Sequence, residues 1–216
     1  MLLKYVICEV FPHKQEAFSF HQTSWSDLSQ MSGFLGQVGG WDIFKANKAH
    51  IISLWENKEQ YQSFMENDHD AIYDHSNQAE SIATIAVDLF TISVPIHGLS
   101  DDPSAFLHKS SYIRIALSFI KPFKQASFTE KQKHLWNPEM AATKAMISGA
   151  FGESCKTDLH FITVTGWTSE YEHESYQLNL LPSLKAQAKT RDDIESIERA
   201  AFLPVEDWTV TPTFLY

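Results

Sequence analysis

His69 is the side chain in this sequence best suited to acid–base chemistry. It lies in the segment 58–77, where Tyr61, Met65 and Ile72 recur at the spacing of one helix face. A rotation of about 100° per residue places His69 at the edge of that apolar stripe. An imidazole there can face a cavity, and its ordinary pKa of about 6.5 suits a general base near neutral pH. The alternative is a half-buried histidine whose ring bonds to a backbone carbonyl.

Four aromatic residues are candidates for holding a flat apolar molecule beside His69. Trp55 ends an apolar run, Trp41 follows a pair of glycines, and Tyr5 and Phe34 lie in the same half of the chain. For a tryptophan, packing in the core is the alternative role. We therefore expect His69 to be the catalytic residue, and Trp55, Trp41, Tyr5 and Phe34 to bind the substrate.

The acidic and histidine residues around His69 do not predict a metal site. Asp70, Asp74 and His75 point in diverging directions around a helix, which favours a solvated face over a set of metal ligands. Asp68 falls in the centre of the apolar stripe, where burial of a carboxylate is costly. We expect the helix to break at Asp68 and a second helical segment to start there.

The elements that must position these residues follow the order β-α-β-β-α-β in the first half. Aliphatic and β-branched runs predict strands, and apolar residues at helical spacing predict helices. The expected elements are a strand at 2–10, a helix at 13–31, a hairpin of 33–41 with 50–55, a helix at 58–77 and a strand at 82–93.

The second half of the chain repeats the first. HIISLWENKEQY from His50 is echoed without a gap by HFITVTGWTSEY from His160, a shift of 110 residues (160 minus 50), and Trp25 is answered by Trp136. The same order of elements follows. The expected elements are a strand at 112–120, a helix at 129–143, a hairpin of 146–151 with 159–165, a helix at 169–189 and a last strand that includes 208–211.

Each half has the order of a split ferredoxin-like unit, in which two helices cover one face of a four-stranded antiparallel sheet. We predict an α+β fold with two such units, 1–97 and 108–216, joined through the polar segment 100–104. Two sheets packed as an α/β barrel would cover each other's open faces and gain about 25 cal/mol per Å² of apolar area buried.

The differences between the copies indicate where a single site would lie. His50, Tyr61 and Trp25 recur under the shift, and architecture explains such shared residues most simply. Trp55, in contrast, is replaced by Thr165, and His69 does not recur as a histidine. We therefore expect the site in the first unit.

Composition narrows the classes of partner. The chain has 216 residues and a net charge of −10, and its 17 lysines and arginines form no dense cluster, which disfavours nucleic-acid binding. No run of 18 apolar residues predicts a membrane span, and the first residues carry no signal pattern. Cys8 and Cys155 lack metal-site spacing, so reduced thiols are expected. The expected location is the cytoplasm, with no membrane partner.

The run GFLGQVGGW followed by AHIISLWENKEQYQSFMENDHDAI carries a family resemblance. It resembles an uncharacterised bacterial family of the dimeric α/β-barrel superfamily, which is related to antibiotic-biosynthesis monooxygenases and haem-degrading monooxygenases. The resemblance covers about residues 20–90. It implies ferredoxin-like units paired sheet to sheet, with a ligand pocket between each sheet and its helices. It is compatible with a monomer that contains an internal pseudo-dimer, or with a homodimer.

The resemblance implies two kinds of chemistry. Haem-degrading members use a tryptophan, an axial histidine and an asparagine on the first strand; Trp55 and His69 match the first two, but LLKYVICEV has no asparagine, so haem is disfavoured and no cofactor is expected. Cofactor-independent members bind an aromatic polyketide and help to deprotonate it. The resulting hypothesis is a monooxygenase-like protein that binds a flat apolar ligand in the first unit. The alternative is a non-catalytic metabolite-binding or structural protein of the same fold.

Overall fold

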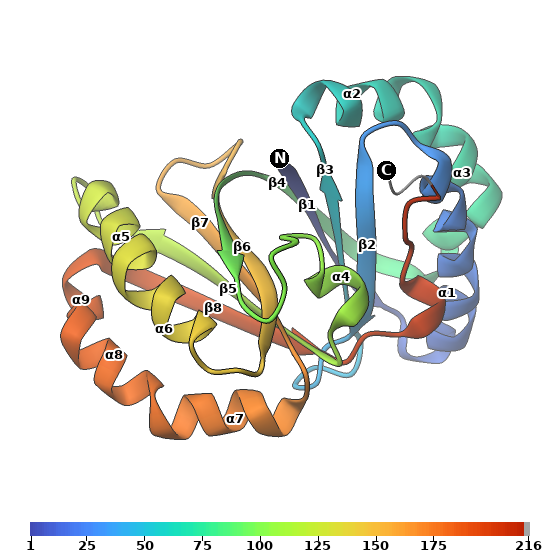
Figure 1. Ribbon diagram of the computed structural model, residues 1–216. Coiled ribbons are helices and arrows are strands. Elements are labelled where there is room, and N and C mark those ends of the chain that lie inside the picture. Colours follow the sequence, from blue (N-terminus) through green and yellow to red (C-terminus); the bar gives the residue numbers. More distant parts are fainter. Residues whose placement is uncertain (214–216) are drawn as a thin grey trace. The chain divides into compact units, whose positions relative to one another are not determined.

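The computed structural model describes residues 1–213 and divides the chain into two compact units (Figure 1). Unit 1 consists of Met1–Leu89 together with the C-terminal segment from Phe202, and unit 2 consists of Phe90–Ala201. Both units have the predicted order β-α-β-β-α-β. The predicted α+β class with two ferredoxin-like units is therefore confirmed, whereas the closure of two sheets into a barrel stays a prediction.

In unit 1 the sheet has the strand order β2-β3-β1-β4, and β3 pairs antiparallel with both β1 and β2. The helices α1, α2 and α3 lie on one face of this sheet (Figure 1). The elements are β1 (Leu2–Val10), η1 (Pro12–Lys14), α1 (Gln15–Gln22), η2 (Thr23–Gln30), β2 (Phe34–Trp41), β3 (Lys48–Trp55), α2 (Lys58–Asn67), α3 (His69–Ser76), η3 (Gln78–Ser81) and the first half of β4 (Ile82–His97).

The helix that carries His69 is interrupted as predicted. The Asn57 side chain accepts a hydrogen bond from the Gln60 amide at 2.8 Å and starts α2. The helix α2 ends at Asn67, and α3 begins at His69, so the break falls at Asp68. The Asp68 carboxylate makes no capping bond there. Asn77 then ends α3 in the left-handed conformation, with φ of 52°.

In unit 2 the strand order is β6-β7-β5-β8, and the second half of β4 pairs antiparallel with β6. The helical segments from α5 to α9 lie on one face of these strands (Figure 1), and α4 packs near Gly166 on the other. The elements are α4 (Phe106–Lys109), β5 (Tyr112–Ile120), α5 (Gln125–Lys131), η4 (Gln132–Trp136), α6 (Asn137–Ala141), β6 (Met146–Ser154), β7 (His160–Trp167), α7 (Glu170–Asn179), α8 (Leu181–Ala188), α9 (Thr190–Asp193) and β8 (Ile194–Phe202). Within residues 1–213, no helix is long and apolar enough to cross a membrane.

The last strand of unit 2 lies earlier in the chain than the sequence predicts. It is β8, whereas Trp208 belongs to the turn η5 (Glu206–Trp208), so the predicted strand at 208–211 is wrong. The sequence of β8, IESIERAAF, is polar and mostly exposed, and it therefore lacks the apolar signature of a buried strand.

The segment that follows β8 packs on unit 1. The fully buried Trp208 ring contacts Phe18 at 5.5 Å and Trp41 at 5.3 Å between ring centroids. Gly40 permits a close backbone approach, because an added Cβ would clash with the Leu203 carbonyl. The units observed in the structure therefore differ from the predicted ranges 1–97 and 108–216, mainly at the C-terminal end.

The strand register gives the true correspondence between the two units. Leu2 pairs with Trp55 in unit 1, and Tyr112 pairs with Trp167 in unit 2, so the shift is 110 on the first strand but 112 (167 minus 55) on the third. The indole of Trp55 donates to the Ser53 hydroxyl at 3.3 Å, as that of Trp167 donates to Thr165 at 3.0 Å. The predicted replacement of Trp55 by Thr165 is therefore wrong: its counterpart is Trp167.

A two-residue slip explains why the ungapped comparison looked consistent. Side chains alternate between the faces of a strand with a period of two, so a shift of two residues keeps every residue on the same face. According to the strand register, the counterpart of His50 in unit 2 is Ile162 and not His160. The later elements keep the shift of 112, since Asn77 and Lys189 both end their helices in the left-handed conformation.

Candidate ligand-binding site

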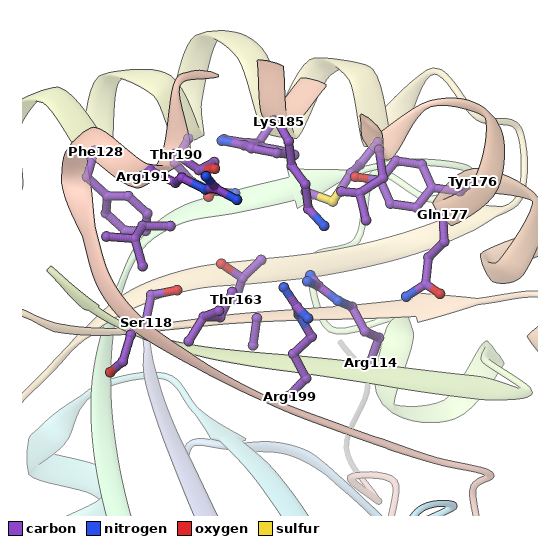
Figure 2. A pocket seen from close by; sticks show the side chains of 18 of the residues that line it. Arg114, Ser118, Phe128, Thr163, Tyr176, Gln177, Lys185, Thr190, Arg191 and Arg199 are labelled. Atoms are coloured by element: carbon purple, nitrogen blue, oxygen red, sulfur yellow. The ribbon is translucent and has the colours of Figure 1, made fainter. Parts of the chain in front are cut away.

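Unit 2 contains an open cavity of about 710 Å³ between its sheet and its helices (Figure 2). Strands β5, β7 and β8 form the floor, and the segments from α5 to α9 form the roof. Ligand pockets of proteins commonly have volumes of about 300 to 1,000 Å³. The cavity is therefore large enough for a small organic molecule with two or three fused rings.

Alternation along the strands places the side chains of the floor. Arg114, Ala116 and Ser118 of β5 are two residues apart and share one face of the sheet, and Thr163 of β7 lies beside them. Arg199 of the outer strand β8 completes this side. The polar part of the floor therefore includes two guanidinium groups, of Arg114 and Arg199, and the hydroxyl groups of Ser118 and Thr163.

The roof is mainly apolar and aromatic. Phe128, Trp136 and Met140 come from the first helical region, and Tyr176 and Leu181 come from the second. Burial raises the pKa of the Tyr176 hydroxyl, so this ring enters the cavity wall uncharged at neutral pH. A flat apolar ligand could pack against these rings while its polar groups face the floor.

Positive charge is concentrated in this cavity. The chain has three arginines, Arg114, Arg191 and Arg199, and all three line the wall together with Lys185. Glu195 is the single carboxylate in the part of the wall that the structure describes. This local excess of positive charge contrasts with the net charge of −10 of the whole chain.

The cations of the wall also influence one another. Burial lowers the pKa of the Arg114 guanidinium. The pKa of Lys185 is lowered first by burial and then by the nearby charges of Arg199 and Arg114. Arg114 is half-buried, whereas Arg199 and Lys185 are exposed, so a ligand that enters the cavity can reach all three.

His173 lies one turn before the wall residue Tyr176 on α7 and was missed by the sequence analysis. Its ring stacks on Tyr112 with centroids 4.9 Å apart, and neither ring nitrogen has a hydrogen-bond partner among residues 1–213. Burial, followed by the charge of Arg114, lowers its pKa to about 3. His173 is therefore neutral at physiological pH, and its counterpart in unit 1 is Tyr61.

The structure places His69 in an aromatic cluster of unit 1. Its ring lies 5.6 Å from Trp25, 5.7 Å from Phe64 and 5.9 Å from Tyr73 between centroids. Its side chain is 18% exposed, and Nδ1 is 2.9 Å from an Asp70 carboxylate oxygen. Its catalytic role stays a prediction.

The four predicted substrate-binding residues lie in different surroundings. Trp55 is buried against Phe34, with ring centroids 5.3 Å apart. The buried Tyr5 hydroxyl is 2.8 Å from Nδ1 of His50, and Trp41 packs on Phe18 at 5.6 Å. Trp55 and Phe34 thus lie together, while Tyr5 and Trp41 contact other residues. Neither these four residues nor His69 belongs to the described wall of the cavity in unit 2.

The two units differ most at the positions that surround the cavity. His69 begins α3 as Leu181 begins α8, so the predicted position is a wall position in the other unit. Under the same shift of 112 (194 minus 82), Tyr73 corresponds to Lys185 and Val87 to Arg199. The distribution of arginine along the chain was the signal in the sequence that could have located the site.

The cavity wall does not fit haem. The described wall contains neither histidine nor cysteine, two common axial ligands of haem iron. The raised pKa of Tyr176 works against a phenolate ligand. Among residues 1–213, no group of three or more histidine, cysteine or acidic side chains is placed to hold a metal ion. Cys8 is buried, Cys155 is exposed, and both are free thiols.

The fold is ferredoxin-like and resembles the folds of several solved proteins named as monooxygenases. The fold is similar to that of a candidate monooxygenase from Fusobacterium nucleatum, with a TM-score of 0.78 and 12% identity, covering 97% of this chain and 94% of that one. A candidate monooxygenase from Lactobacillus acidophilus gives a TM-score of 0.74 at 12% identity, covering 97% and 95%. A ferredoxin-fold protein from Listeria monocytogenes related to antibiotic-biosynthesis monooxygenases gives 0.53 at 8% identity, covering 95% of each chain.

Sequence comparison gives the family. The chain is 44% identical over 106 residues to the uncharacterised protein YdbC of Bacillus subtilis, covering 48% of this chain and 89% of that protein. The chain belongs to the family of this Bacillus protein. Residues 2–90 match a domain of unknown function, DUF4937. This match covers the N-terminal segment of unit 1 and ends where unit 2 begins. The cavity lies in unit 2.

Proposed function

We propose that this protein binds a small, flat organic molecule in the cavity of unit 2. The observation that carries the proposal is the open space of about 710 Å³ between sheet and helices, with aromatic rings in its roof and two arginines in its floor. This is the location between sheet and helices expected for a ligand of this fold, but in the second unit. The position in unit 2 replaces the first-unit site as our preferred hypothesis.

The packing of unit 1 supports this choice. The His69 ring contacts three aromatic rings there, with centroid distances of 5.6 to 5.9 Å to Trp25, Phe64 and Tyr73. Lys4, the counterpart of Arg114, lies over the Trp25 ring at 5.6 Å. The cation of unit 1 therefore already has an aromatic partner.

The similar proteins named as monooxygenases favour an oxygenase as the catalytic form of this proposal, without a cofactor. The alternative is a protein of the same fold that binds a metabolite without turning it over, because one fold supports many functions. Oxygen consumption by the protein with a bound ligand distinguishes the two forms. Uptake of O2 together with an oxidised product supports catalysis, and unchanged ligand after prolonged incubation supports binding alone.

A ligand screen with two matched variants tests the location of the site. Aromatic compounds that raise Tm of the wild type are titrated by calorimetry into wild type, Ala116→Phe and His69→Ala. Ala116 faces the cavity from β5, so a phenyl ring there occupies ligand space. We expect binding to be lost in Ala116→Phe and kept in His69→Ala. Binding that survives Ala116→Phe but is lost in His69→Ala would overturn the proposal in favour of unit 1.

A further inference from the structure

We infer that the ligand is an aromatic carboxylate whose negative group is held by Arg114 and Arg199 from the sheet and by Lys185 from α8. This inference rests on the proposed function and specifies the chemical class of the ligand. It is carried by the convergence of three cations on one part of the cavity.

Figure 2 shows this convergence directly. The side chains of Arg114 and Arg199 rise from β5 and β8 with their guanidinium groups toward the roof, and Lys185 extends from α8 toward them. The mutual influence of these charges agrees with this geometry, since Arg114 and Arg199 both act on the Lys185 ammonium. The space between the three groups is where an anion would gain most from all of them.

The part of the chain that the structure describes supplies no paired anion for these cations. Within residues 1–213, Arg114, Arg199 and Lys185 form no ion pair with a carboxylate. Glu195, the acidic residue of the wall, precedes Arg199 by four positions on β8, a separation of about 13 Å along an extended strand. Its carboxylate is therefore too far along the strand to neutralise the cluster.

The equivalent cation of unit 1 provides the contrast. The Lys4 ammonium lies 5.6 Å from the ring centroid of Trp25 and 6.0 Å from that of Tyr61. Both rings therefore stabilise its charge by cation–π interaction. In unit 2 the residue opposite Arg199 and Arg114 is a third cation, Lys185. Converging cations without an internal partner are expected where a protein binds an anion.

The chemistry of the wall selects a carboxylate on an aromatic body. A guanidinium group matches the two oxygens of a carboxylate with parallel N–H donors, and two such groups flank the space. The rest of the ligand meets Phe128, Trp136 and Tyr176, which favour flat rings.

Calorimetric titration with 2-naphthoate and 2-naphthamide tests the inference, because the two probes share a shape and differ in charge. We expect the carboxylate to bind wild type at least tenfold more tightly than the amide. Arg199→Gln should weaken 2-naphthoate binding at least tenfold and change 2-naphthamide binding by less than twofold. Lys133→Gln removes an exposed positive charge of the same unit outside the cavity wall, and we expect it to change both affinities by less than twofold.

The outcomes separate this inference from the proposed function. Equal affinity for both probes, or equal weakening of both by Arg199→Gln, would overturn the carboxylate inference and leave the cavity as a binding site. Failure of both probes to bind wild type would count against the cavity as a site for flat aromatic ligands. Arg199 lies on an exposed outer strand, and circular dichroism of each variant verifies the fold. Arg114→Gln provides a second variant, for which the same selective loss is expected.

Discussion

The two units share one scaffold but differ in how they use the space between sheet and helices. In unit 1, His69 packs against Trp25 and Tyr73, and Lys4 lies over the Trp25 ring. In unit 2, the corresponding elements line an open cavity with Lys185 and Arg199 in its wall. The comparison shows that a duplicated fold can keep core residues at corresponding positions in both copies, while the residues that line the cavity of unit 2 are replaced in unit 1.

The shared scaffold is clearest at the paired tryptophans. Trp55 and Trp167 occupy the same strand position, make the same bond to a hydroxyl two residues earlier, and are 1% and 0% exposed. The cavity positions show the opposite behaviour, because leucine, lysine and arginine replace histidine, tyrosine and valine. We therefore expect the functional site at positions where the two units differ, as the sequence analysis did, but in unit 2 and not in unit 1.

The largest expected effect comes from either of the paired tryptophans. Trp55→Ala and Trp167→Ala should each lower the free energy of unfolding by about 3 to 5 kcal/mol, because each removes a fully buried ring. Urea denaturation of both variants measures the effect. Similar losses support equivalent structural roles. A stable Trp55→Ala that loses ligand binding would instead restore Trp55 as a substrate-binding residue.

The pH dependence of the free energy of unfolding should reflect His173, a titratable residue of unit 2 whose counterpart in unit 1 is a tyrosine. Its folded pKa of about 3 lies below the unfolded value of 6.5, so the unfolded chain binds the extra proton between these values. Stability from this group is complete above pH 6.5 and falls as the pH decreases toward 3, by about 2 kcal/mol between pH 6.5 and 5. His173→Tyr, which copies Tyr61 of unit 1, should reduce this decline. An unchanged profile in denaturation experiments at pH 5 to 8 would contradict the assignment.

Transfer of a single residue from unit 1 should impair the cavity. Lys185→Tyr introduces the counterpart Tyr73, removes one of the converging cations and adds a ring. We expect 2-naphthoate to bind about tenfold more weakly, with the stability of the ligand-free protein unchanged within about 1 kcal/mol, since Lys185 is exposed. Calorimetry and urea denaturation measure the two quantities. Unchanged affinity would show that Lys185 is not part of the carboxylate site.

The smallest expected effect on binding is that of His69→Ala. We expect less than a twofold change in the affinity for 2-naphthoate, because His69 lies in unit 1 and outside the described wall. Its contacts with Trp25 and Tyr73 predict a loss of stability of about 1 kcal/mol. Calorimetry on the folded variant checks the first value. A loss of binding larger than tenfold would favour the first-unit site.

The sequence predicted most elements because local patterns specify them. β5 begins and ends where predicted, at Tyr112 and Ile120, and the helix break at Asp68 was also anticipated. The strand β8 was missed because Glu195, Ser196, Glu198 and Arg199 are exposed and give no apolar periodicity. Its position became evident only from its pairing in the sheet.

The candidate site was harder to predict because it depends on the sizes of neighbouring side chains. The role of His69 stays a prediction, and its counterpart Leu181 lines the cavity of unit 2. Sequence spacing places both residues on the same helix face but does not show that Trp25 and Tyr73 pack against one of them. The slip of two residues hid the equivalence of Trp55 and Trp167 and thereby directed attention to unit 1.

The most direct test of the central claim is to map the bound ligand by NMR. Backbone amide shifts of the 15N-labelled protein are recorded during titration with 2-naphthoate. The account predicts shift changes concentrated in residues 112–120 and 181–199, with little change in residues 58–77. Changes concentrated in 58–77, with 112–120 and 181–199 unaffected, would contradict it.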